Sequence, residues 1–166
     1  MGQSKGLILF EGNTLVERAY DQLAKVVEDV YVSLRPAQVD SFSFLKLRGI
    51  SILEDQITAI GPAAALLRAH QEFLDEDWFM LACDFPRADP EDIQKMAAAY
   101  YADQTAEVIC YQNLKKISEP LFAIWRKSAL QKLAKNVSAE NFGPQFTLKD
   151  CSRNEMNVTH ERSLFN

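Results

Sequence analysis

Short apolar runs and longer stretches of helical periodicity alternate along the whole chain. Apolar runs of strand length lie at residues 7–10, 30–34, 50–53, 78–83, 106–111 and 121–125. Between most of them, apolar side chains recur every three or four positions, which indicates helices with one buried face. Strands that alternate with helices in this way predict an α/β protein. We expect a three-layer, mostly parallel, Rossmann-like sheet with helices on both faces.

The predicted helices carry recognisable start signals. Thr14 and Glu17 have the spacing of a capping box, so a helix should begin there and continue to about residue 26. The stretch Asp89-Pro90-Glu91-Asp92 combines a cap, a first-turn proline and first-turn acids, which predicts a second helix to about residue 101. Further helices are expected at residues 63–74, more weakly near 37–47, at 128–136 and from 144 onward.

The composition narrows the class of protein. The chain has 166 residues, 48% of them hydrophobic, so we expect one globular domain over residues 1–166. The formal net charge is -5 and the acids and bases are mixed, which argues against a nucleic-acid-binding face. No signal sequence or long apolar run is present, so we expect a cytoplasmic protein without a membrane partner.

Candidate metal ligands are limited to oxygen donors. The cysteines Cys83, Cys110 and Cys151 are far apart, and the only histidines are His70 and His160. This set forms neither a disulfide framework nor a zinc site. Any metal should therefore be a hard cation such as Mg²⁺, held by carboxylates.

Acidic residues follow two of the predicted strands, at the edge where parallel sheets bind ligands. Asp84 comes directly after the apolar run 78–83 and precedes Phe-Pro. It fits two interpretations: a polar turn residue that ends the strand, or a carboxylate that holds Mg²⁺ against a phosphate. Asp55 follows the run 50–53. It fits three interpretations: a solvated loop acid, an acceptor of a hydrogen bond from a sugar hydroxyl, or a second metal contact.

Gly2 and Lys5 precede the first helix. Glycine and lysine ahead of a helix often hold phosphate, but such loops normally follow a strand, and none precedes them here. Lys5 by itself is most often a solvated lysine near a mobile terminus.

Five stretches in order resemble the molybdenum cofactor guanylyltransferases, the MobA-like branch of the nucleotidyltransferases. They are MGQSKGLILFEGNTLVERA, DQITAIGPAAALLRA, WFMLACDFP, EPLFAIWRKSALQKL and NEMNVTHERSL. Each motif is modest alone, but together they cover nearly the whole chain at the spacing of the family.

The resemblance implies a reaction and a set of roles. GTP and molybdopterin would give the guanine dinucleotide cofactor and pyrophosphate in a Mg²⁺-dependent transfer. By this likeness Asp84 binds Mg²⁺, Lys5 meets the phosphates, and both are catalytic. Asp55 contacts the nucleotide, and Arg35 falls near a position that often contacts the base.

The chain also departs from the family. It lacks the apolar strand and the Leu-Ala-Gly-Gly-x-Ser-x-Arg loop that usually come just before Met-Gly. That strand is normally central in the sheet, so without it two rows of backbone groups should lie open and the core should be split. Our hypothesis is that Met1 corresponds to an internal methionine of a longer protein, which makes this an N-terminally truncated nucleotidyltransferase domain.

Two alternatives share the same motifs. One is a transferase of the same fold that uses CTP or a sugar-phosphate acceptor. The other is a degenerate, non-catalytic homologue that binds only nucleotide or a partner such as a molybdoenzyme chaperone. Nucleotide competition and pyrophosphate release distinguish these alternatives.

Overall fold

The computed structural model describes residues 4–57 and 59–164. The strands are β1 (Leu9–Phe10), β2 (Asn13–Thr14), β3 (Tyr31–Leu34), β4 (Ser51–Glu54), β5 (Trp78–Leu81), β6 (Val108–Gln112), β7 (Ser118–Trp125) and β8 (Arg153–Asn157). The α-helices are α1 (Leu15–Leu23), α2 (Phe44–Leu47), α3 (Ala63–Glu72), α4 (Pro90–Ala102), α5 (Lys127–Ser138) and α6 (Pro144–Leu148). Short 3-10 turns are η1 (Lys5–Leu7), η2 (Pro36–Gln38), η3 (Asp40–Phe42) and η4 (Glu161–Leu164).

The strands form a four-stranded sheet in the order β5-β7-β6-β8, a separate parallel pair β3-β4, and a small β1-β2 hairpin. The β6–β8 pair is also parallel, but β7 runs antiparallel to both β5 and β6. The reason is the short turn between β6 and β7, where the Asn113 amide donates to the Ile117 carbonyl oxygen at 2.9 Å. Strands joined by such a turn pair antiparallel. The α/β class is confirmed, and β7 is the exception to a parallel sheet.

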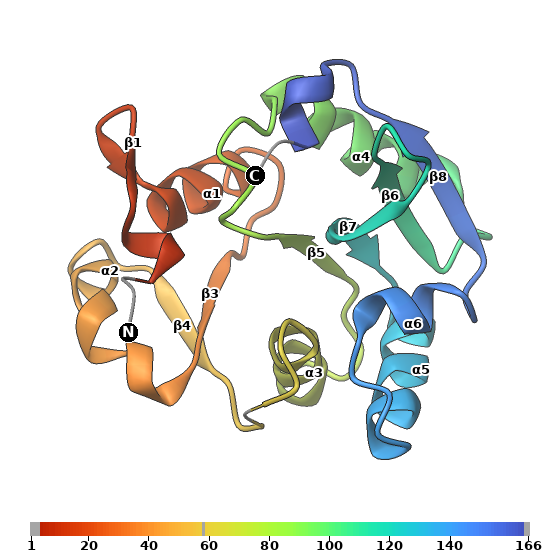
Figure 1. Cartoon of the computed structure of the whole chain (residues 1–166), viewed down its shortest axis with the longest axis horizontal. Coiled ribbons are helices and arrows are strands. Elements are labelled where there is room, and N and C mark those ends of the chain that lie inside the picture. The colour runs from red at the N-terminus through yellow and green to blue at the C-terminus, as the bar shows by residue number, and fades with distance from the viewer. Residues whose placement is uncertain (1–3, 58, 165–166) are drawn as a thin grey trace.

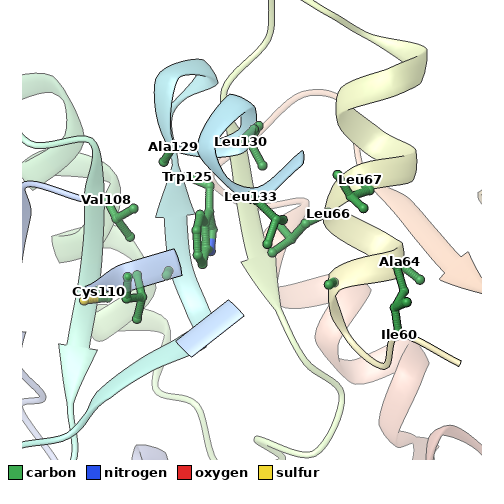
Figure 2. Close-up of a cluster of buried hydrophobic side chains, with 13 residues drawn as sticks. Ile60, Ala64, Leu66, Leu67, Val108, Cys110, Trp125, Ala129, Leu130 and Leu133 are labelled. Atoms are coloured by element: carbon green, nitrogen blue, oxygen red, sulfur yellow. The ribbon is translucent and has the colours of Figure 1, made fainter. Parts of the chain in front are cut away.

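Helices cover both faces of the sheet, as the sequence predicted. Figure 1 shows α1 and α4 on one side of the row of strands and α3, α5 and α6 on the other. Alternate residues of β6 and β7 enter the two cores. On one face, Val108 and Trp125 pack against Leu66 of α3 and Leu133 of α5 (Figure 2). On the other face, Ile109 and its neighbours pack against α4 and the end of α1.

The helix starts follow their local signals. The Thr14 hydroxyl accepts from the Glu17 amide at 3.3 Å, and the Glu17 carboxylate accepts from the Thr14 amide at 3.1 Å, so the capping box of α1 is confirmed. Asp89 caps α4 by accepting from the Glu91 amide at 2.9 Å. The stretch expected as a helix near 37–47 is instead mostly 3-10 turns, with only the four-residue α2 at its end.

The core is divided between β3 and β5. Within the described part of the chain, the β3-β4 pair shares no backbone ladder with the four-stranded sheet. Its residues Val32 and Leu34 belong to a separate apolar cluster, whereas the Tyr31 ring contacts β5, with its centre 5.7 Å from the ring centre of Trp78. A cavity of about 1080 Å³ lies between the two strands and is walled by α1 and α3. The split core that the sequence led us to expect is therefore present. None of the described helices has the length and apolar character needed to cross a membrane.

Candidate functional site

The four residues singled out in the sequence line one cavity. Lys5, Arg35, Asp55 and Asp84 all contribute to the cavity between β3 and β5. Arg35 follows β3, Asp55 follows β4, and Asp84 comes three residues after the end of β5. The carboxyl ends of β3, β4 and β5 therefore bring Arg35, Asp55 and Asp84 to the cavity, as expected for a ligand site on such a sheet, and η1 adds Lys5.

Asp84 lies in the turn that follows β5. The turn is closed by the Phe85 amide, which donates to the Ala82 carbonyl oxygen at 3.2 Å. The Oδ2 atom of Asp84 lies 3.4 Å from Nζ of Lys5, and the Asp84 side chain is 26% exposed. Its Oδ1 atom is buried and accepts no hydrogen bond from the described residues. Leaving a buried oxygen without a donor costs free energy, which makes this atom a candidate ligand for a cation.

The carboxylate of Asp84 fits a magnesium ion better than a zinc ion. Across residues 4–57 and 59–164, no group of three His, Cys, Asp or Glu side chains is assembled to hold a metal. Mg²⁺ is commonly held by one or two carboxylates, with substrate phosphates and waters as its other ligands. The donor set therefore suits a cation that arrives with a phosphorylated substrate.

Lys5 is placed at the site by the close packing of its neighbour Gly6. Lys5 opens η1, and Gly6 is buried against the ring of Phe42. A Cβ atom on residue 6 would lie 3.0 Å from the Phe42 ring, so only glycine fits without a shift. The Lys5 side chain itself is 70% exposed, so its ammonium group, which pairs with Asp84, is also accessible to an anionic ligand.

Asp55 is the most buried of the four side chains, at 7% exposed. Its Oδ1 atom accepts a hydrogen bond from the Ser33 hydroxyl at 2.5 Å. Burial raises the pKa of the Asp55 carboxyl, while the Ser33 hydrogen bond and the charge of Arg35 act in the opposite direction. This environment differs from that of a solvated loop acid.

Gln38 joins two parts of the site and was not singled out in the sequence. Its side-chain oxygen accepts from Arg35 Nε at 3.1 Å, and its side-chain nitrogen donates to the Ser4 hydroxyl at 2.9 Å. The bridge ties the turn after β3 to the segment that carries Lys5. The spacing of three residues from Arg35 to Gln38 resembles a capping pair and is the one local sign of this contact.

Cys83 lies beside Asp84 without the character of a nucleophile. Burial, and next the charge of Asp84, raise the pKa of the Cys83 thiol. A thiol is nucleophilic as the thiolate, so Cys83 stays protonated and unreactive at neutral pH. The charged groups of the site are thus suited to positioning and charge stabilisation rather than covalent catalysis.

Comparison with known proteins identifies the relatives of this chain. A family model described as MobA-like NTP transferase domain matches residues 1–152. The molybdenum cofactor biosynthesis bifunctional protein of Synechocystis is 29% identical over 99% of this chain, and the match spans 46% of that protein. A probable molybdenum cofactor guanylyltransferase from Geobacillus is 26% identical over 90% of this chain and 75% of its own length.

A solved structure has the same fold. The molybdopterin-guanine dinucleotide biosynthesis protein A of Archaeoglobus fulgidus superposes with a TM-score of 0.78 at 18% sequence identity. The match covers 99% of this chain and 84% of that chain. The chain therefore has the fold of that protein.

Proposed function

The chain belongs to the MobA-like NTP transferase family, and from this premise we propose that it transfers GMP from GTP to molybdopterin. The observation that carries the proposal is the meeting of Lys5 and Asp84, 3.4 Å apart, at the carboxyl end of β5. Residues 79 positions apart in the sequence bring together an ammonium group and a carboxylate whose second oxygen is buried without a hydrogen-bond donor from the described residues.

The proposed reaction needs no protein nucleophile. A phosphate oxygen of molybdopterin attacks the α-phosphorus of GTP, and the bond from that phosphorus to the bridging oxygen breaks. Pyrophosphate leaves with the electron pair. Both the attacking group and the leaving group are anionic, so the protein acts mainly by positioning them and offsetting their charge.

The site residues have distinct parts in this scheme. Asp84 would hold Mg²⁺, which supplies polarisation of the α-phosphate when bound. Lys5 would neutralise charge that grows on the departing phosphates. Asp55 would accept a hydrogen bond from the nucleotide, and Arg35, which lines the same cavity, would face its base.

The effect of each nucleotide on the melting temperature tests the proposal directly. We expect GTP with Mg²⁺ to raise the melting temperature of the protein, whereas CTP at equal concentration leaves it nearly unchanged. At a GTP concentration 100 times its dissociation constant, the stabilisation is about 2.7 kcal/mol. With molybdopterin added, pyrophosphate should be released in step with GTP consumption.

The outcomes separate the rival functions. Stabilisation by CTP in place of GTP would assign the chain to a cytidylyl transfer. Tight GTP binding without pyrophosphate release would indicate a non-catalytic, nucleotide-binding homologue. The absence of any effect from either nucleotide would contradict the proposal as a whole.

A further inference from the structure

Ser33 and Asp55 are neighbours on one face of the β3-β4 pair. Ser33 of β3 pairs with Leu53 of β4, and Asp55 follows two residues later. Because alternate residues of a strand point to the same face, Ser33 and Asp55 are diagonal neighbours there. The Asp55 amide donates to the Leu34 carbonyl oxygen at 2.9 Å, which extends the ladder past the end of β4 and fixes the backbone of Asp55.

We infer that Ser33 is a positioning residue, whose hydroxyl orients the Asp55 carboxylate toward the nucleotide in the cavity. The inference rests on the proposed function. Ser33 Oγ donates to Asp55 Oδ1 at 2.5 Å, and both residues line the cavity. Among the described residues, Oδ2 of Asp55 has no donor within hydrogen-bonding geometry, so it is the oxygen left for a ligand.

Packing in the apolar core does not explain why residue 33 of β3 is a serine. Val32 and Leu34, on the other face of the strand, are buried in the apolar cluster with Phe42 and Leu45. Ser33 faces the cavity instead, where its hydroxyl is used on Asp55. A buried carboxylate with one oxygen held by a hydroxyl keeps a single orientation. The nucleotide then binds a carboxylate that is already ordered, so less conformational entropy is lost on binding.

The Ser33 hydroxyl also affects the pH at which the Asp55 carboxyl ionises. Burial raises the pKa of Asp55, and the Ser33 hydrogen bond and then the Arg35 charge counter that effect. Arg68 of α3 brings a further positive charge close to this part of the chain, since its Nε atom donates to the carbonyl oxygen of Glu54, the residue before Asp55, at 3.1 Å.

Lys5 and Asp84, which line the same cavity, contribute one charge of each sign. Because the Ser33 hydrogen bond lowers the pKa of Asp55, removal of that hydroxyl should raise the pKa further. The carboxyl would then lose its charge at a higher pH than it does in the wild-type chain.

The test is the pH dependence of GTP binding, measured with Mg²⁺ by titration calorimetry. In Ser33→Ala, we expect roughly tenfold weaker GTP binding near neutral pH, the effect of one hydrogen bond to a charged group. The pH below which affinity falls should move upward. Ser33→Thr keeps a hydroxyl and should restore both values, whereas Ser33→Val has the shape of threonine without the hydroxyl and should not.

Ser51→Ala is the matched control, since Ser51 is an exposed serine on the adjacent strand β4. If Ser33→Ala and Ser33→Val bind GTP within twofold of Ser51→Ala and keep the wild-type pH dependence, the positioning role is wrong. A lower melting temperature with unchanged pH dependence would likewise mark Ser33 as merely structural. Failure of the wild-type chain to bind GTP would overturn the proposed function together with this inference.

Discussion

Asp84→Asn is expected to lower kcat/KM for GMP transfer by about 100-fold or more at saturating Mg²⁺. Charge stabilisation of a transition state by a preorganised or metal-bound group is worth roughly 3–4 kcal/mol in comparable sites. The amide keeps the shape of Asp84 but loses the charge that pairs with Lys5 and the oxygen pair that suits a hard cation. The measurement is pyrophosphate release as a function of GTP and Mg²⁺ concentration.

The apparent Mg²⁺ affinity gives this experiment a second readout. It should weaken in Asp84→Asn in parallel with the rate. Asp75→Asn is the control, because Asp75 precedes the opposite end of β5 and its side chain is 86% exposed. A loss of less than tenfold in Asp84→Asn, or an equal loss in the control, would contradict the metal-binding role.

Asp92→Ala is expected to lower the free energy of unfolding by about 2–4 kcal/mol, the largest effect on stability that we predict. Asp92 is fully buried in the first turn of α4. Its carboxylate accepts from the Thr159 amide and from the Ser163 hydroxyl, each at 2.7 Å. Alanine would remove the acceptor of both bonds and leave the Ser163 hydroxyl, which is buried, without this partner. Thermal melting should record a fall of roughly 5–15 °C for a chain of this size.

The neighbouring acid provides the control for Asp92. Glu91 is exposed and pairs with Lys95 one turn later, so Glu91→Gln should change stability by less than about 1 kcal/mol. Because Asp92 holds the segment of Thr159 and Ser163, limited proteolysis near the C-terminus should also accelerate in Asp92→Ala. Equal melting temperatures for the two variants would show that these hydrogen bonds contribute little.

The parts of the fold that follow from local chemistry could be read from the sequence. The capping box of Thr14 and Glu17 specifies where α1 begins, since its atoms lie within one turn. The apolar run before Asp84 specifies strand β5 and puts the carboxylate in the turn that follows it. Both features depend on neighbours a few residues away, and sequence patterns report such neighbours well.

Features that depend on distant partners could not be read in this way. Strand β8 has the sequence Arg-Asn-Glu-Met-Asn, whose residues are at best partly buried, so its apolar pattern is weak. It forms because β6 offers a parallel ladder. The contact of Ser33 with Asp55 likewise arises from the register of β3 on β4, across 22 residues. Tertiary pairing decides these elements, and single-sequence periodicity does not contain it.

The cavity between β3 and β5 has a consequence for how the molecule behaves in solution. Amide and carbonyl groups on the facing sides of the two strands must be hydrated, because no described strand pairs with them there. The amide protons on these facing sides should exchange with solvent well before those of β6, which is paired on both sides. Unpaired strand edges can also pair with another copy of the chain. Concentrated samples should therefore aggregate first through the facing edges of β3 and β5.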